Sequence, residues 1–256
     1  MNDALGDRMK KNYENVSKTF LTRRMPVIIR LDGKAFHSFT KGFKKPFDKV
    51  FCDTMIKTTE YLCKNIQGCV FGYTQSDEIS LLLVDYKNLN TDAWFNYSIQ
   101  KCVSIAASMA TMAFNREFAH QVRRYKEERI KDKTHIWNSY KDNYYVTIYN
   151  AISKGAMFDA RIFNIPKEEV VNYFIWRQND CYRNCINSVA QHLFSQAQLY
   201  KKNTLELKNL IGDKHDYKEW QLLGSSFLKC VNYKWDYSCF DFKQNRKLIE
   251  EQFIFN

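Results

Sequence analysis

The order of the expected secondary-structure elements constrains the fold of this 256-residue chain more than any other feature. Apolar, β-branched runs predict strands at 27–31, 69–74, 79–84 and 158–165, and apolar side chains at helical spacing predict helices at 48–65 and 92–124. The order strand, helix, strand, strand, helix, strand is typical of a split β-α-β, ferredoxin-like domain with an antiparallel sheet. We therefore expect an α+β fold in which the second and third strands form a hairpin.

The remainder of the chain gives weaker signals. We expect a basic helix over 1–24, a short strand near 145–149, and helical structure over 167–200 in two pieces. The last fifty residues show no clear pattern. Because no Ser/Gly-rich linker separates the parts, we expect a domain over 1–165 and a mainly helical region over 166–256 packed against it.

Two acidic motifs stand at the ends of predicted strands. Asp32 and Gly33 follow the first strand, and Asp77 and Glu78 lie in the hairpin connection. The first strand and the hairpin are neighbours in a split β-α-β sheet, so Asp32 and Asp77 are expected to lie close together. Like charges at that distance repel, and a divalent cation with oxygen ligands, Mg²⁺, relieves the repulsion. We therefore expect two Mg²⁺ ions, held by Asp32, Asp77 and the Gly33 carbonyl, in a site suited to phosphoryl displacement. The alternative is that both acidic motifs are ordinary turns.

The net charge of +11 is unevenly distributed along the sequence. Between residues 8 and 49, twelve Lys and Arg residues stand against three Asp and Glu residues, a local excess of nine. Lys34, Lys44 and Lys45 flank the expected metal loop. Basic charge concentrated in this way favours binding of a triphosphate or an RNA backbone. The alternatives are solvated surface lysines and the lysine bias of an AT-rich genome.

Several function classes lack their signatures in this sequence. It contains neither of the glycine motifs G-x-x-x-x-G-K-[ST] and G-x-G-x-x-G, nor the nucleophile elbow G-x-S-x-G. Its eight cysteines include no C-x-x-C pair, so reduced thiols are expected rather than a zinc site. The N-terminus lacks the apolar segment of a signal peptide, and no apolar run is long enough to span a bilayer. We therefore expect a cytoplasmic protein with no membrane partner.

Several motifs resemble the tRNA-His guanylyltransferase family. The main ones are Arg30–His37 (RLDGKAFH), Lys45–Asp48 (KPFD) and Gly72–Ser80 (GYTQSDEIS). Further similar segments are Trp94-Phe95 with Lys101, Phe158–Arg161 (FDAR) and Trp176–Cys181 (WRQNDC). The motifs keep the family order and together span roughly residues 25–190.

The resemblance implies a palm domain like that of polymerases, used in the reverse, 3′-to-5′ direction. Family members add nucleotides to the 5′ end of tRNA. ATP or GTP first activates the 5′-monophosphate, and the 3′-hydroxyl of an incoming nucleoside triphosphate then attacks the activated phosphate. The implied partners are tRNA, GTP and ATP, the implied cofactor is a pair of Mg²⁺ ions, and the implied assembly is a homotetramer.

The resemblance also implies roles for single residues. Asp32, the Gly33 carbonyl and Asp77 resemble the Mg²⁺ ligands, and Glu78 resembles a supporting carboxylate. Lys45 resembles a lysine involved in activation, and Lys101 resembles a lysine that contacts the triphosphate. The residues similar to the nucleotide-binding segments are Asp32, Gly33, Lys34, Ala35, Phe36 and His37, together with Ser76 and Asp77.

Two departures from the family pattern bear on the substrate. Where members dedicated to tRNA-His carry H-I-N-N-L-Y-N, this chain carries Tyr182–Ser188 (YRNCINS), and Phe47 replaces the Asn of K-P-N-D. These changes resemble the guanylyltransferase-like branch, whose members repair truncated tRNA 5′ ends by templated addition. The alternatives are a tRNA-His-specific enzyme, a palm-domain nucleotide cyclase and a non-catalytic tRNA-binding protein.

Overall fold

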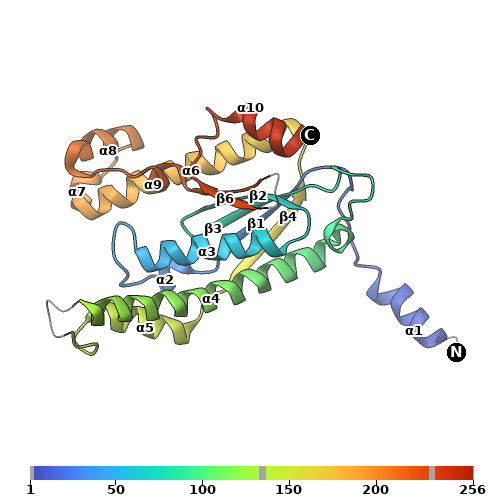
Figure 1. Ribbon diagram of the computed structural model, residues 1–256, viewed down its shortest axis with the longest axis horizontal. Coiled ribbons are helices and arrows are strands. Elements are labelled where there is room, and N and C mark those ends of the chain that lie inside the picture. The colour runs from blue at the N-terminus through green and yellow to red at the C-terminus, as the bar shows by residue number, and fades with distance from the viewer. Residues whose placement is uncertain (1–2, 133–136, 231–233, 256) are drawn as a thin grey trace.

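The computed structural model describes residues 3–132, 137–230 and 234–255. It contains a six-stranded antiparallel sheet in the order β4-β1-β3-β2-β5-β6 (Figure 1). The strands are β1 (Val27–Gly33), β2 (Cys69–Gln75), β3 (Glu78–Leu83), β4 (Phe158–Asn164), β5 (Ser225–Lys229) and β6 (Trp235–Ser238). The order β4-β1-β3-β2 is that of a split β-α-β domain, so the expected α+β, ferredoxin-like architecture is confirmed.

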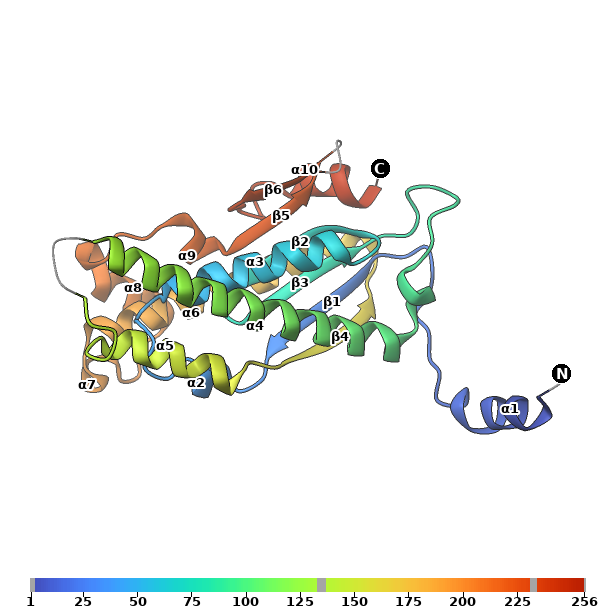
Figure 2. The same cartoon turned by 60° about the horizontal axis from the view of Figure 1, so that its bottom comes forward.

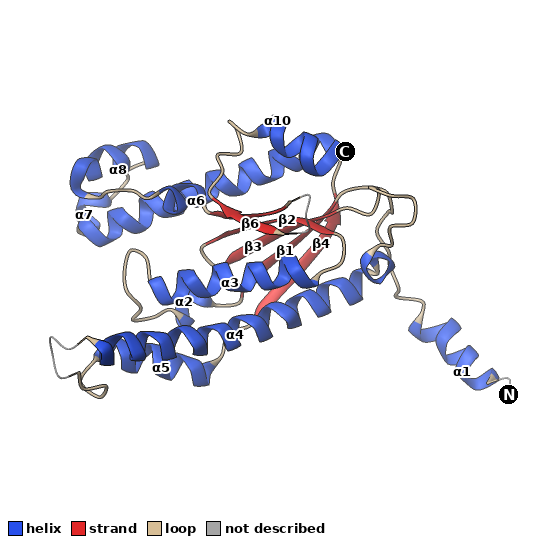
Figure 3. Cartoon of the chain, in the orientation of Figure 1, coloured by secondary structure: helices blue, strands red, loops and turns tan. Residues whose placement is uncertain are grey.

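Helices cover both faces of the sheet (Figure 3). The α-helices are α1 (Ala4–Met9), α2 (Phe36–Phe39), α3 (Lys49–Asn65), α4 (Ile99–Lys131), α5 (Asn143–Lys154), α6 (Val170–Leu193), α7 (Gln196–Leu199), α8 (Thr204–Ile211), α9 (Glu219–Leu223) and α10 (Arg246–Ile249). The short 3-10 and π segments are η1 (Lys10–Glu14), η2 (Trp94–Tyr97), η3 (Lys167–Glu169), η4 (Gly212–Lys214) and η5 (Glu250–Phe255). Among the described residues, no helix is both long and apolar enough to cross a membrane.

The central strand β1 is packed on both of its faces. Val27, Ile29 and Leu31 are buried in a cluster with side chains of α3 and α4, whereas Ile28 is buried in a second cluster with side chains of α6. A strand covered on both sides carries a nearly continuous apolar sequence, which is why this segment is so readily predicted. The two layers fix the direction of β1 and therefore the position of Asp32 near its end.

The prediction of a short strand near 145–149 is wrong, because this segment belongs to helix α5. Asp142 caps the helix, since its carboxylate accepts a hydrogen bond from the Tyr145 N–H at 2.9 Å. Tyr145, Ile148 and Ala151 are buried at a spacing of three residues, which places them on one helical face. The aromatic and β-branched composition of the segment favours a strand, but the cap and the spacing of its buried residues favour the helix.

The C-terminal part of the chain is mainly helical, as expected, but it also completes the sheet. Strand β5 pairs with β2, with Ser225 opposite Thr74, and β6 pairs with β5. These two strands were not predicted, since the last fifty residues show no alternating pattern. The division of the chain at residue 165 stays a prediction, and the sheet itself continues beyond it.

The N-terminal helix is shorter than expected. Segments α1 and η1 end at residue 14, and none of their residues is buried. They project away from the rest of the chain (Figure 2). Leu5, Met9 and Tyr13 are 60%, 41% and 68% exposed and recur at helical spacing, so they form an exposed apolar stripe, and Val16 in the following turn is 73% exposed.

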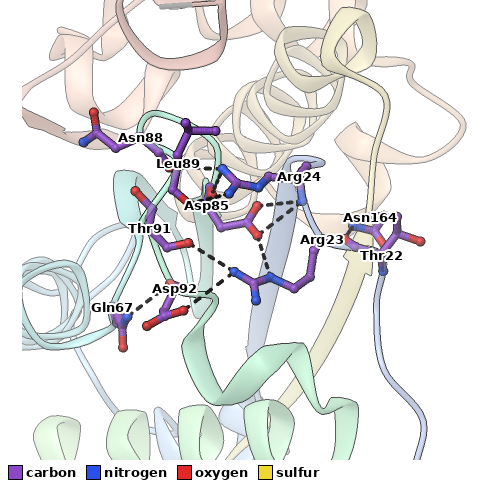
Figure 4. A network of polar contacts seen from close by, with 10 residues as sticks. All are labelled: Thr22, Arg23, Arg24, Gln67, Asp85, Asn88, Leu89, Thr91, Asp92 and Asn164. Atoms are coloured by element: carbon purple, nitrogen blue, oxygen red, sulfur yellow. Dashed lines mark hydrogen bonds and ion pairs between the residues drawn. The ribbon is translucent and has the colours of Figure 1, made fainter.

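A polar network fixes the segment before β1 to the loop after β3 (Figure 4). Asp85 is 1% exposed and accepts hydrogen bonds from the Arg24 backbone N–H at 2.9 Å and from Arg23 Nε at 3.2 Å. The Arg24 guanidinium donates to the carbonyls of Asp85, Asn88 and Leu89. Two arginines of the basic N-terminal segment therefore hold the fold together.

Asp85→Ala is expected to lower the free energy of unfolding by about 3 kcal/mol, because it removes the buried acceptor of two arginines. Asp92→Ala is the matched control, since Asp92 pairs with the same Arg23 but its side chain is 85% exposed. A loss below about 0.5 kcal/mol is expected for this variant. Urea unfolding measures the free energy of unfolding of both variants. Equal losses of this free energy in the two variants would contradict the structural role of Asp85.

Candidate active site

Strand β1 and the β2–β3 hairpin bring the predicted acidic residues to one end of the sheet. Asp32 lies opposite Glu78 in the β1–β3 ladder, and the Gly33 N–H donates to the Asp77 carbonyl at 3.1 Å. Gly33 has no room for a side chain, because a Cβ there would lie 2.3 Å from the Phe36 ring. The close approach of Phe36 therefore explains the glycine that follows Asp32.

Asp32 and Asp77 lie close enough for the charge of one to act on the other. Burial raises the pKa of Asp77, and the negative charge of Asp32 raises it as well. Within the described ranges, Asp77 forms no ion pair, and its Oδ1 accepts a hydrogen bond from the Ser76 hydroxyl at 3.1 Å. Asp32 has Arg30 at 3.8 Å. A divalent cation between the two carboxylates would remove the remaining repulsion.

The donor set of this site fits Mg²⁺. No group of three or more His, Cys, Asp or Glu side chains converges on a metal position among the residues that the structure describes. A cation here would therefore rest on two carboxylates and the neighbouring Gly33 carbonyl. Mg²⁺ is commonly held by one or two carboxylates and completed by water and substrate phosphate oxygens. Asp32 and Asp77 thus fit a Mg²⁺ site of this kind.

Glu78 supports the site through two arginines. Its Oε2 accepts a hydrogen bond from Arg177 Nη1 at 2.8 Å and lies 3.5 Å from Arg30 Nε. The side chains of Glu78 and Arg177 are only 7% and 6% exposed. Burial raises the pKa of Glu78, while the two guanidinium groups act in the opposite direction. Since Arg30 also reaches Asp32, this buried cluster ties α6 to the end of β1.

A cavity of about 350 Å³ lies beside Asp77. Its walls come from α2 and the loop after it, the first half of α3, the β2–β3 turn, α6 and the segment around α9. The predicted site residues that line it are Phe36, His37, Lys45, Ser76 and Asp77. Its volume lies in the range of about 300–1,000 Å³ that is usual for small-molecule sites.

The backbone is strained where two of the predicted nucleotide-binding segments meet the cavity. Ala35, which precedes α2, has φ of 55°, and Ser76, in the β2–β3 turn, has φ of 50°. Non-glycine residues in this left-handed region are held there by their surroundings and cluster at functional sites. Lys34 is exposed beside them, and its backbone N–H donates to the Met157 carbonyl at 2.9 Å.

Two lysines that the sequence analysis connected with phosphate binding, Lys101 and Lys44, are not free at the cavity. The first lies away from it, and the second is held by two tyrosine rings. Lys101 is in the first turn of α4, and Thr111, ten residues later, binds the first residue of β4 at the cavity end of the sheet. Ten helical residues span about 15 Å, so Lys101 lies near the opposite end of the sheet. Lys44 lines the cavity, but its Nζ lies over the rings of Tyr144 and Tyr125, at 4.3 and 5.3 Å from their centroids.

The positive charge that is concentrated in sequence is dispersed in space. Arg23 and Arg24 belong to the Asp85 network, and Arg30 is bound in the buried cluster with Glu78. Lys34 and Lys45 form no ion pair with any described residue, and of these two only Lys45 lines the cavity. The free cationic charge at the cavity is therefore much smaller than the sequence count indicates.

Helix α6 and the segment around α9 contribute cavity residues that the sequence did not predict. Cys181, Cys185 and Ser188 lie on one face of α6, and Trp220 and Gln221 come from α9. The helical spacing of the α6 residues can be read from the sequence and places them on one face. The sequence around α9 shows no pattern that indicates a helix or a site. All eight cysteines are free thiols, as expected. Burial raises the pKa of both Cys181 and Cys185 to about 12, so they stay neutral.

The family model of tRNAHis guanylyltransferase, Thg1, matches residues 6–166. An uncharacterized protein of Acanthamoeba polyphaga mimivirus is 32% identical over 221 residues, which are 82% of this chain and 70% of that protein. A mouse protein named probable tRNA(His) guanylyltransferase is 27% identical over 177 residues, 68% of this chain. The match spans only 49% of the mouse protein, about half of its length.

Solved structures of the same family share the fold. A bacterial tRNA(His) guanylyltransferase (Thg1)-like protein in complex with ATP has a TM-score of 0.79 and 35% identity, covering 99% of this chain and 100% of that chain. Its complex with GTP has a TM-score of 0.73 and 34% identity at the same coverage. The family match, the fold and the aspartate site agree, and the chain belongs to the tRNAHis guanylyltransferase (Thg1) family of nucleotidyltransferases.

Proposed function

We propose that this chain is a Mg²⁺-dependent nucleotidyltransferase that adds nucleotides to the 5′ end of tRNA in the 3′-to-5′ direction. The observation that carries this proposal is the convergence of Asp32, Gly33 and Asp77 beside a cavity of about 350 Å³. Two close carboxylates that share no counterion among the described residues, next to a space for a small ligand, are suited to metal-assisted phosphoryl transfer.

The reaction has two phosphoryl steps. In the first, an oxygen of the tRNA 5′-phosphate attacks the α-phosphorus of ATP or GTP, and pyrophosphate leaves. In the second, the 3′-hydroxyl of an incoming nucleoside triphosphate loses its proton and attacks the activated 5′-phosphorus, and the nucleoside monophosphate leaves. Asp32, Asp77 and the Gly33 carbonyl would hold the two Mg²⁺ ions, which would supply charge neutralisation to the reacting phosphates.

The side chains around the aspartates bind and orient the phosphates. Lys45 lines the cavity and forms no ion pair with a described residue, so its ammonium group is available to neutralise phosphate charge during activation. His37 and Ser76 line the same wall and offer hydrogen bonds. Glu78 acts through Arg30 and keeps the Asp32 carboxylate in place, so it is a positioning residue. Lys101 lies near the opposite end of the sheet from Asp77, so its contact with a triphosphate bound at Asp77 would require a neighbouring subunit.

We propose templated repair of truncated tRNA 5′ ends rather than a reaction restricted to tRNA-His. Support comes from residues 182–188, which apart from Asn184 depart from the segment of dedicated family members, and of the departing residues Cys185 and Ser188 line the cavity. The bacterial Thg1-like protein with 35% identity covers this chain almost completely, whereas the match to the mouse protein covers half of that protein. Pairing with the opposite strand of the acceptor stem would choose the added nucleotide.

We expect the kcat/KM for labelled GTP addition to be at least about 10-fold higher on a tRNA that lacks its first nucleotide than on full-length tRNA-His. The reason is that an unpaired base in the opposite strand orients the incoming nucleotide at the reacting phosphate. The truncated substrate is tRNA-His without its first nucleotide, so both tRNAs carry a 5′-monophosphate and differ only at this end. A preference for full-length tRNA-His would overturn the repair proposal and leave the nucleotidyltransferase proposal in place.

We also propose a homotetramer. The apolar stripe of Leu5, Met9 and Tyr13, with Val16 in the following turn, has no cover among the residues that the structure describes. A helix of this length is marginal in water unless its apolar face is packed, and a second copy of the chain would supply that packing. Cytoplasmic location likewise stays a prediction.

A further inference from the structure

The loop that follows α2, residues 40–48, brings Lys45 to the wall of the cavity. The Lys45 side chain is exposed and forms neither a hydrogen bond nor an ion pair with any residue that the structure describes. The position of its ammonium group before a substrate binds therefore depends on the backbone on either side of it. The Lys44 N–H donates to the Asp48 carboxylate at 2.9 Å, which closes this backbone around Lys45.

Asp48 is the buried residue at the end of this loop, with an exposure of 5%. Its Oδ1 accepts the Phe51 N–H at 2.9 Å, which caps α3, and its Oδ2 accepts the Tyr144 hydroxyl at 2.8 Å. Burial raises the pKa of Tyr144, and the negative charge of Asp48 raises it as well, so the hydroxyl stays protonated and donates. A hydrogen bond to a charged acceptor is about twice as strong as one between neutral groups. Tyr144, on α5, thus holds the end of the loop.

The ring of Tyr144 contacts the same loop at a second place. The Lys44 Nζ lies 4.3 Å from the centroid of this ring and 5.3 Å from that of Tyr125, and such cation–π contacts are attractive. The two rings pack at 80° with centroids 5.1 Å apart, and the Tyr125 hydroxyl donates to the Asp142 carboxylate at 3.1 Å. Because Tyr125 lies on α4 and Asp142 caps α5, the ring of Tyr144 is held between these two helices.

Tyr144 therefore contacts the loop on both sides of Lys45, at Lys44 through its ring and at Asp48 through its hydroxyl. It does not itself line the cavity. We propose that Tyr144 is a positioning residue for the activation step, which holds the loop so that Lys45 meets the phosphates of the activating nucleotide. The inference rests on the proposed function, which assigns Lys45 to that step. A displacement of such a group by about 1 Å lowers a rate by up to about 100-fold.

A tRNA that already carries a 5′-triphosphate separates activation from addition. On this substrate the 3′-hydroxyl of the incoming nucleotide loses its proton, its oxygen bonds to the 5′ α-phosphorus of the tRNA, and the bond to the leaving pyrophosphate breaks. No nucleotide is consumed for activation. On a 5′-monophosphorylated tRNA the activation step must come first. A residue that positions Lys45 acts on the monophosphorylated tRNA alone, whereas a residue needed for the fold acts on both.

We expect Tyr144→Leu to lower labelled GTP addition to the 5′-monophosphorylated truncated tRNA by about 100-fold, measured in single turnover with saturating ATP and Mg²⁺. Tyr144→Phe keeps the ring beside Lys44 and loses only the hydroxyl, so a loss of about 10-fold is expected. Addition to the same tRNA with a 5′-triphosphate should stay within about 2-fold of wild type for both variants. Lys45→Met should show the same difference between the two substrates.

Tyr149→Phe and Tyr149→Leu are the matched controls, because Tyr149 lies on the same helix, is 55% exposed and is outside the cavity. Both controls should match wild type on either tRNA. Equal losses on the two tRNAs in the Tyr144 variants, or unchanged activation in Tyr144→Leu or Lys45→Met, would overturn the inference. If wild type extends neither tRNA, the proposed function fails and the inference fails with it, an outcome distinct from a loss confined to the variants.

Discussion

Asp32→Ala and Asp77→Ala are each expected to lower the rate of nucleotide addition by at least about 10³-fold, because either change removes several kcal/mol of charge stabilisation from the transition state. The fold should remain intact. The Asp32 side chain is 35% exposed, and burial raises the pKa of Asp77, so ionised Asp77 is a cost to the folded state. Removing either carboxylate relieves their repulsion, and the ion pair lost with Asp32 is the long one to Arg30 at 3.8 Å, while Arg30 keeps Glu78 as a partner.

Two measurements check this expectation on the same preparations. Incorporation of labelled nucleotide into truncated tRNA reports activity, and thermal unfolding without added metal reports stability. Asp213→Ala, at an exposed position of η4, is the control for loss of an aspartate. Full activity in Asp32→Ala or Asp77→Ala would refute the metal site, and a large fall in Tm would show that the residue acts on the fold.

Arg177→Met is expected to lower the free energy of unfolding by about 3 kcal/mol, because it leaves Glu78 buried with Arg30 as its remaining partner. Arg183→Met is the matched control on the same helix. Arg183 also pairs with an acidic residue, Asp180, but its side chain is 59% exposed. Its replacement should therefore cost less than about 1 kcal/mol.

The double variant Glu78→Gln/Arg177→Met separates the ion pair from packing. Because both charges are then absent, its stability should be closer to wild type than the sum of the two single losses predicts. Guanidinium chloride unfolding of wild type, the two single variants and the double variant gives the coupling free energy between the two side chains. Additive losses in the double variant would contradict a direct buried pair between Glu78 and Arg177.

The catalytic half of the fold is predictable because its signals are local. Val27–Leu31 is apolar because both faces of β1 are covered, and the hairpin of β2 and β3 is marked by two apolar runs with a short polar connection. From these elements alone, the meeting of Asp32 and Asp77 follows from the strand order. The prediction of a strand near Tyr145 is wrong because the residue types of this segment favour a strand, while its buried positions recur at helical spacing.

The rest of the site depends on contacts between residues far apart in sequence. Trp220 reaches the cavity because β5 pairs with β2, and nothing near Trp220 in sequence indicates that pairing. The charge pattern overestimates the free positive charge near the site for a similar reason. Arg23 and Arg24 are bound by Asp85, which lies about sixty residues later in the sequence. A count of lysines and arginines along the chain does not show which of them have partners.

The end at which a nucleotide is added tests the central proposal most directly. A 5′-monophosphorylated tRNA that lacks its first nucleotide is incubated with the full chain, Mg²⁺ and the four nucleoside triphosphates, and both ends of the product are sequenced. We predict growth at the 5′ end, dependent on Mg²⁺ and ending when the acceptor stem is fully paired. Growth at the 3′ end, a cyclic nucleotide made without tRNA, or tRNA binding with no incorporation would contradict the proposed function.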